Sequence, residues 1–155
     1  MKKMSIITII LLLTALVVVS GCNKREENQT LINFFGEKKY SELSSICTDK
    51  DKLRIATDLI EKARCVMTDT QKKYTTDEVK ALERYSFYDP TITNVDVNIE
   101  LITTEQIGNE GYIWVRYTTK YYYNTDLVSG SDDIISRWTI ENDNTQWYVT
   151  SIEEP

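Results

Sequence analysis

Carboxylates and tyrosine hydroxyls are the groups in this chain that could carry out proton-transfer chemistry. A carboxylate that removes a proton and a phenol that stabilises the developing oxyanion can together isomerise or dehydrate a small molecule in a dry pocket. The candidates of these types in the C-terminal half are Asp96, Glu100, Tyr117, Tyr121 and Asp133. Asp96 and Glu100 alternate with apolar residues over residues 94–101, so they share a polar face. We therefore expect these carboxylates to face solvent, and we predict no catalytic residue.

Histidine is absent from the 155 residues. Its absence excludes Ser–His–Asp and Cys–His catalysis, the usual zinc ligand sets and the usual pH switch near neutrality. Two acidic turns, residues 49–52 and 141–144, lack the Asp-x-Asp-x-Asp-Gly spacing and the distal glutamate of a calcium loop. We expect neither a metal site nor a cofactor.

A strand predicted over residues 112–124 has two different faces. Its odd-numbered residues from Ile113 to Tyr123 are suited to the core of a curved sheet. The opposite face combines aromatic rings with cations, namely Tyr112, Trp114, Arg116, Lys120 and Tyr122. Such a face suits binding of a peptide, a glycan or a partner protein. The same side chains also stabilise a half-exposed sheet through cross-strand contacts without binding anything, and we favour this second interpretation.

The N-terminus has the pattern of an export signal. Lys2 and Lys3 precede an apolar run over residues 4–19, and Ser20 and Gly21 follow it. Sixteen helical residues cover roughly 24 Å, which is short of the ~30 Å hydrocarbon core of a bilayer. The charge order predicts that the chain after the run is exported.

The tetrapeptide Val19-Ser20-Gly21-Cys22 closely resembles the bacterial lipobox. The resemblance implies that Cys22 is thioether-linked to diacylglycerol and becomes the new N-terminus. Two or more acyl chains, such as palmitate, form a stable anchor, whereas one chain alone is marginal. The alternatives are a plain transmembrane anchor and an ordinary cleaved secretory signal. We predict a protein anchored by lipid at the extracytoplasmic face of the cell membrane.

Two further cysteines, Cys47 and Cys65, remain once Cys22 is acylated. Export into an oxidising space permits a disulfide between them. The alternative is two free thiols on helix faces. The chain contains no Cys-x-x-Cys pair, so a thiol-redox enzyme is not expected.

Removal of residues 1–21 leaves 134 residues, a length suited to one domain with one core. Because Lys2 and Lys3 are lost, 16 basic residues stand against 24 acidic ones, and the net charge becomes −8. So acidic a domain argues against nucleic acid as a partner. We expect a signal peptide over residues 1–21, a polar tether over 22–29 and a folded domain over 30–155.

The domain divides into a helical half and a strand half. Apolar residues at three- and four-residue spacing predict helices over residues 30–40, 40–47, 49–67 and 75–85. Thr75 and Glu78 stand in the register of a capping box. Segments in which apolar and polar residues alternate, or which are rich in aromatic and β-branched residues, predict strands. These strands cover residues 94–101, 112–124, 134–140 and 146–152, with a turn at 127–133. Helices followed by antiparallel strands indicate an α+β domain, with the helices packed on one face of a curved sheet of about four strands.

This pattern resembles the NTF2-like (cystatin-like cone) superfamily, as found in small lipoproteins of Gram-positive bacteria. The stretches that carry the resemblance are "LINFFGEKKYSELSSIC", similar to the opening helix pair, and "DDIISRWTIENDNTQWYVTSIEEP", similar to the final hairpin. The resemblance implies a cone whose helices cover the concave side of the sheet and sometimes leave a pocket. The superfamily includes ketosteroid-isomerase-like enzymes and many non-catalytic binding and scaffold domains.

From these patterns we expect a non-enzymatic, lipid-anchored module that binds a small ligand or an envelope protein through the sheet or the mouth of the cone. The first alternative is a small-molecule isomerase or dehydratase that uses an Asp–Tyr pair in the cone. The second is a component of an envelope assembly, such as a conjugation or phage-exclusion apparatus. An enclosed pocket with a buried carboxylate beside a tyrosine hydroxyl would favour the enzyme, and a filled cone with an exposed aromatic strip would favour the binding module.

Overall fold

The computed structural model describes residues 25–155, and the chain forms two compact units. The first unit comprises residues 1–40 together with Pro155, and the second comprises Ser41–Glu154. In the first unit the described residues 25–40 are helical, so the predicted polar tether is helical from residue 25 onward. The rings of Phe34 and Phe35 pack edge to face there, with centroids 4.8 Å apart.

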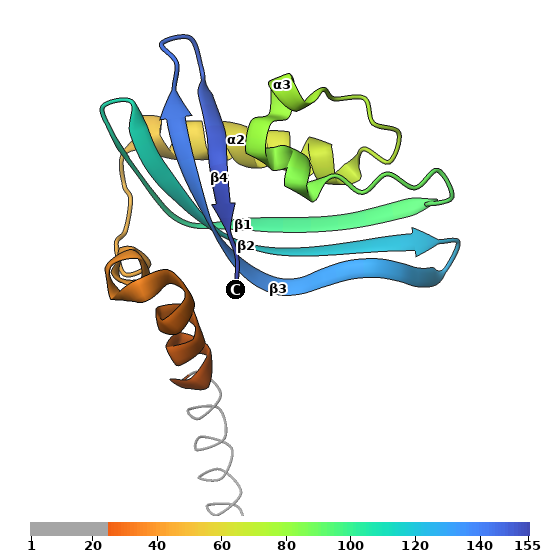
Figure 1. Ribbon diagram of the computed structural model, residues 1–155, viewed down its shortest axis with the longest axis horizontal. Helices are drawn as coiled ribbons and strands as arrows, with labels where there is room; N and C mark the ends of the chain where they lie inside the picture. Colours follow the sequence, from red (N-terminus) through yellow and green to blue (C-terminus); the bar gives the residue numbers. More distant parts are fainter. Residues whose placement is uncertain (1–24) are drawn as a thin grey trace, which may run out of the picture. The chain divides into compact units, whose positions relative to one another are not determined.

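The second unit contains a single antiparallel sheet whose strands follow one another in chain order, which confirms the predicted α+β class. The strands are β1 (Asn94–Ile107), β2 (Glu110–Tyr123), β3 (Asp126–Asn142) and β4 (Trp147–Glu153). Figure 1 shows that the sheet is strongly curved and does not close into a barrel.

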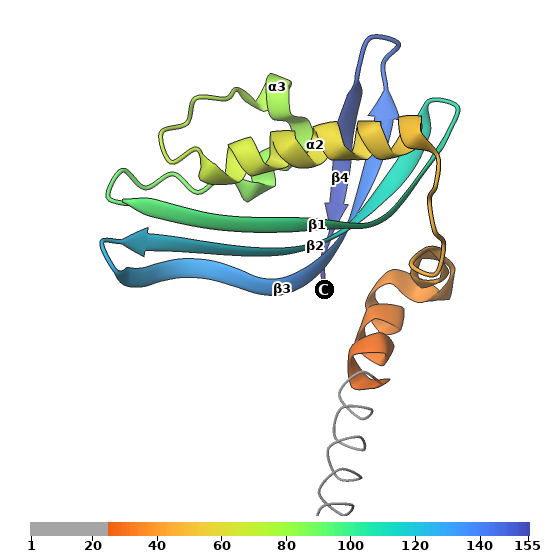
Figure 2. The same ribbon diagram turned by 180° about the vertical axis from the view of Figure 1, so that it is seen from behind.

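The helices of this unit lie within the curve of the sheet. They are α2 (Lys50–Thr68), the single turn α3 (Thr76–Val79) and the 3₁₀ helix η1 (Lys80–Tyr85). In both views α2 runs along the concave side of the sheet, and α3 and η1 lie on that same side (Figures 1 and 2). Asp49 begins α2 because its carboxylate accepts hydrogen bonds from the backbone N–H groups of Asp51 and Lys52.

The capping box predicted at Thr75 is present. The carboxylate of Glu78 accepts a hydrogen bond from the backbone N–H of Thr75 at 2.7 Å. The helix predicted over residues 40–47 is wrong, because helical structure ends at residue 42. The hydroxyls of Ser44 and Ser45 donate to the carbonyls of Ser41 and Glu42, and this competition for backbone groups ends the helix.

The turn predicted over residues 127–133 is also wrong. The chain reverses at residues 124–125, and β3 then pairs with β2 through the glycine- and serine-rich segment. Two register shifts in this ladder absorb the irregular residues, and Asp133 takes a positive φ of 55° at one of them. Pairing with a long neighbouring strand therefore overrides the local turn preference.

The core lies between α2 and the concave face of the sheet. Trp138, Ile113 and Ile140 are fully buried there, against the apolar stripe of α2. The predicted odd-numbered core face of β2 is confirmed from Ile113 to Tyr121, whereas Tyr123 is half exposed at the strand end.

Candidate functional site

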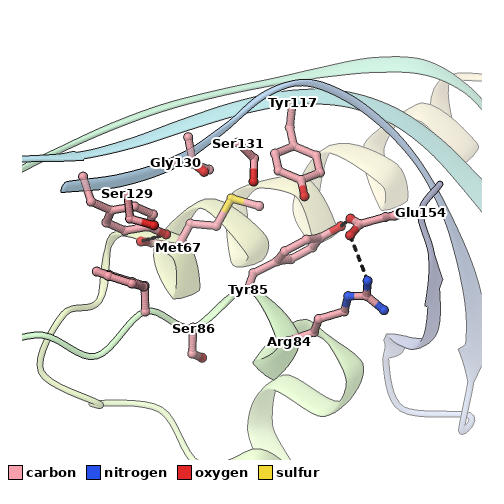
Figure 3. A pocket seen from close by; sticks show the side chains of 12 residues that line it. Met67, Arg84, Tyr85, Ser86, Tyr117, Ser129, Gly130, Ser131 and Glu154 are labelled. Atoms are coloured by element: carbon pink, nitrogen blue, oxygen red, sulfur yellow. Dashed lines mark hydrogen bonds and ion pairs between the residues drawn. The ribbon is translucent and has the colours of Figure 1, made fainter. Parts of the chain in front are cut away.

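A pocket of about 260 Å³ opens on the concave side of the sheet, between β2, β3 and η1. Figure 3 shows it from close by, with the strands above and η1 below. We call it the concave pocket. Its wall is rich in hydroxyl groups, supplied by Ser86, Tyr117, Thr119, Tyr121, Ser129 and Ser131. Among the residues that line it, Arg84 carries the one cation and Glu154 the one carboxylate.

Glu154 directly follows the last residue of β4, and its side chain is 11% exposed. One carboxylate oxygen, Oε2, lies 3.2 Å from Nη2 of Arg84, and the other, Oε1, accepts a 2.8 Å hydrogen bond from the hydroxyl of Tyr85. Both interactions are drawn in Figure 3. The carboxylate therefore lies between a guanidinium at the pocket rim and a phenol inside it.

Tyr85 connects this carboxylate to the core. Its hydroxyl oxygen accepts a 2.8 Å hydrogen bond from the indole N–H of Trp138, and it lies 3.1 Å from Oγ of Ser136. Burial raises the pKa of Tyr85 well above its usual range, and the nearby charge of Glu154 raises it further. Tyr85 is thus held as a neutral phenol whose proton points at Glu154.

Tyr117 is the second phenol beside the carboxylate. Its ring packs edge to face on Tyr85, with centroids 5.3 Å apart. Burial raises the pKa of Tyr117, the charge and hydrogen bond of Glu154 raise it further, and a hydrogen bond with Ser131 opposes them. Two neutral phenols and one guanidinium, from η1 and β2, therefore surround Glu154. We call this group, comprising Arg84, Tyr85 and Tyr117, the carboxylate seat.

The other end of the concave pocket is aromatic and apolar. The ring centroids of Phe87 and Tyr121 lie 4.4 Å apart, and Met67 of α2 also lines the pocket. The hydroxyl of Tyr121 donates to the backbone carbonyl of Met67, and burial raises the pKa of Tyr121. The pocket therefore lies between two aromatic pairs, and its charge is confined to one end.

The structure brings together only part of the predicted proton-transfer set. Tyr117 and Tyr121 line the concave pocket, whereas Asp96 and Glu100 are exposed, as expected. Asp133 is also exposed, and it accepts two hydrogen bonds from Arg116 on the convex face.

The carboxylate that does reach the pocket is Glu154, which was not among the candidates. A signal for it was present, because Glu154 stands two residues after the core residue Ile152, in the alternation of a strand.

The predicted binding face is only partly available. Trp114 is fully buried, so the centre of this face does not present the exposed aromatic ring that the binding interpretation needs. Arg116 is engaged by Asp133, and Arg137 lies over the ring of Tyr112, 5.1 Å from its centroid. Lys120 and Tyr122 remain half exposed beside β1. These contacts are the cross-strand stabilisation that the sequence analysis favoured for this face.

A second carboxylate cluster lies on this convex face. Glu42 accepts hydrogen bonds from Nε and Nη2 of Arg137 at 2.8 and 3.0 Å, and from the indole N–H of Trp114 at 2.8 Å. The side chains of Arg137 and Glu42 are 11% and 18% exposed. We call Glu42, Trp114, Arg137 and Tyr112 the convex cluster.

The disulfide that the sequence permits between Cys47 and Cys65 is not formed, and both cysteines are free, which was the alternative interpretation. Cys47 precedes the N-cap of α2, whereas Cys65 lies near its other end. The helix between them separates their positions by roughly 20 Å, far beyond the ~7 Å limit between the Cα atoms of a disulfide. Cys22 and the lipobox residues Val19, Ser20 and Gly21 lie outside the described residues.

Within residues 25–155, no helix is both long and apolar enough to cross a membrane. In the same part of the chain, no group of three or more cysteine, aspartate or glutamate side chains could hold a metal ion. No protein-family model matches this chain, and comparisons with curated proteins and with solved structures found no significant match.

Proposed function

We propose that this protein is a lipid-anchored, extracytoplasmic domain of NTF2-like type that binds a small molecule in the concave pocket. The observation that carries the proposal is the pocket itself, about 260 Å³ lined by hydroxyl groups, with aromatic pairs on two sides and an oriented carboxylate at one end. A few converging polar groups in a largely aromatic concavity are typical of small-ligand sites. The anchor rests on the lipobox-like pattern that ends at Cys22.

A fragment screen by ligand-observed NMR tests the binding site. Ser131→Leu places a bulky side chain at the pocket wall and should abolish binding of the fragments that bind the wild type. Ser151→Leu makes the same change at an exposed position of β4 and is the matched control. If the fragments bind both variants equally well, or if none binds the wild type, the proposed binding site is wrong.

Membrane fractionation and mass spectrometry in a Gram-positive host test the anchor. The wild-type protein should sediment with membranes and carry a diacylglyceryl adduct at its N-terminal cysteine. Cys22→Ala should lack the adduct and leave the membrane fraction, whereas Cys65→Ala changes an exposed cysteine and should retain both. A Cys22→Ala protein that keeps an unchanged membrane fraction would contradict lipid anchoring.

A second candidate function is proton-transfer catalysis, which the position of Glu154 between two neutral phenols favours. Glu154 would remove a proton from carbon, and the phenols of Tyr85 and Tyr117 would donate to the resulting oxyanion. Against this role, both carboxylate oxygens are already engaged, one with Arg84 and the other with the hydroxyl of Tyr85, so a substrate would have to displace one of these contacts before a proton could be removed.

Proton exchange at carbon separates this candidate from simple binding. An enzyme should accelerate exchange of the α-protons of cyclohexanone in D₂O, measured by NMR, and Glu154→Gln should abolish the acceleration. Exchange at the rate of buffer alone would exclude this chemistry for that ketone and leave the binding function standing.

A further inference from the structure

The carboxylate seat has the composition of a binding site for a carboxylate. Arg84 supplies a guanidinium, and Tyr85 and Tyr117 supply hydroxyls that burial keeps protonated. Arg84 and Tyr85 both donate to a single acceptor, and the hydroxyl of Tyr117 lines the pocket beside them. In the structure this acceptor is a side chain of the chain itself, that of Glu154.

Glu154 is held in the seat by few other contacts. It lies beyond Glu153, the last residue of β4, so the strand ladder does not fix it. Arg84 meets it through one contact of 3.2 Å, and the arginine side chain is 56% exposed. Because this arginine is more than half exposed, water competes for its side of the contact. The carboxylate itself is 11% exposed and also accepts from Tyr85, so it gives up the seat when another acceptor takes its place there.

We infer that Glu154 is an internal occupant of the seat, and that the ligand of the concave pocket is a small molecule with a carboxylate group that displaces it. This inference rests on the proposed binding function and adds the chemical class of the ligand. When Glu154 leaves, Arg84 is the one charged side chain left in the pocket wall, so the vacated site attracts an anion.

The part of the concave pocket beside the carboxylate seat indicates which chemical group the ligand carries next to its carboxylate. The space beside the seat is bounded by the Phe87–Tyr121 pair and the Tyr85–Tyr117 pair. Aromatic walls favour a flat ring, which packs against them by offset or edge-to-face contact. The hydroxyls of Ser129 and Ser131 lie along the same wall and can serve polar substituents on the ring. An aromatic acid of a single ring fits this description.

Isothermal titration of the full chain in detergent with benzoate, benzamide and benzylamine tests the inference. These probes share a ring and differ in charge. We expect benzoate to bind the wild type and to bind Glu154→Gln roughly tenfold more tightly, because the neutral amide competes less well for the seat. Arg84→Gln should lose benzoate binding. Glu110→Gln removes the same charge from an exposed position far from the pocket wall and should match the wild type.

Two results would overturn the inference. The first is tighter binding of benzylamine or benzamide than of benzoate, and the second is weaker binding of benzoate to Glu154→Gln. Either result would mean that Glu154 contributes to ligand binding and does not compete with the ligand for the seat. The proposed binding function would survive either result, since a ligand still occupies the pocket. If none of the probes binds any variant, the inference is also wrong, and the fragment screen with Ser131→Leu decides the binding function independently.

Discussion

The two faces of the sheet each carry a cluster built from the same residue types: a glutamate, an arginine, a tryptophan N–H and a tyrosine. In the convex cluster, Glu42 accepts two hydrogen bonds from Arg137 and one from Trp114, and both charged side chains are largely buried. In the carboxylate seat, Glu154 meets Arg84 through one contact, and that arginine is more than half exposed.

The difference lies in what surrounds each carboxylate. Around Glu42, Nε and Nη2 of Arg137 and the indole N–H of Trp114 all point at the carboxylate, and Arg137 also donates to Thr139 and packs on the ring of Tyr112, so the cluster is closed. Beside Glu154 there is a pocket of about 260 Å³. The indole of Trp138 reaches this carboxylate only through the hydroxyl of Tyr85. The convex cluster is therefore suited to stabilise the fold, and the carboxylate seat is suited to exchange partners.

The largest expected effect is that of Glu42→Ala. Removal of one partner leaves Arg137 and the Trp114 N–H buried without an acceptor, which should reduce the free energy of unfolding by about 3 kcal/mol. Urea unfolding followed by tryptophan fluorescence measures the change. Glu37→Ala, at an exposed helical position, is the control. A loss below about 1 kcal/mol would show that the convex cluster contributes no more to the free energy of unfolding than an exposed ion pair does.

The next effect is a loss of stability at alkaline pH that originates in the carboxylate seat. The pKa values of Tyr85 and Tyr117 are raised above the 10.0 of an unperturbed tyrosine. Stability should therefore be constant below about pH 10 and fall above it, by up to about 1.4 kcal/mol per pH unit for each tyrosine. Urea unfolding over a pH series measures the slope.

Tyr85→Phe should reduce this alkaline slope without abolishing it, because it removes one of the two titrating phenols of the seat, while Tyr117 and the buried Tyr121 continue to titrate. The control is Tyr123→Phe, which changes a half-exposed ring outside the seat and should keep the slope of the wild type. An unchanged slope in Tyr85→Phe would contradict the assignment of the alkaline transition to the carboxylate seat.

At neutral pH, Tyr85→Phe should have a smaller effect than Glu42→Ala. The variant loses one hydrogen bond to Glu154, but Trp138 keeps Ser136 as an acceptor at 3.0 Å and Glu154 keeps Arg84. We expect a loss of about 1 kcal/mol, measured by the same urea unfolding. An effect as large as that of Glu42→Ala would mean that the seat is as structural as the convex cluster.

The smallest effect on stability is expected for Arg84→Gln, and it gives the sharpest comparison with Arg137→Gln. The exposed Arg84 should contribute less than about 0.5 kcal/mol, whereas the buried Arg137 should contribute several kcal/mol. Thermal unfolding of both variants in parallel measures the difference. Equal melting temperatures would remove the distinction between a closed cluster and an open one.

Local sequence patterns predicted much of the fold because each reports a nearby physical preference. The apolar stripe of α2, the capping box at Thr75 and the core face of β2 follow from helical and strand periodicity. The segment over residues 127–133 was predicted incorrectly because its glycine and serine residues favour a turn locally. Ladder hydrogen bonds to β2 outweigh that preference, and they form only when the sheet assembles.

The candidate site was less predictable for a related reason. Alternation placed Tyr117 and Tyr121 on the concave side, but it does not say which carboxylate faces them. Glu154 reaches Tyr85 across 69 positions of the chain, and Arg84 reaches it from η1. Alternation likewise placed Trp114 on the convex face without indicating that this position is fully buried.

By itself, the sequence determined the α+β class, the bounds of α2, the inward face of β2 and the exclusion of histidine chemistry. The tertiary structure alone decided that Cys47 and Cys65 stand at opposite ends of a helix, that Trp114 is buried and that Glu154 lies between two tyrosines. The physical reason is that periodicity fixes the direction of a side chain relative to its own element. Its partners depend on how the elements pack, and that is set by contacts between residues far apart in the chain.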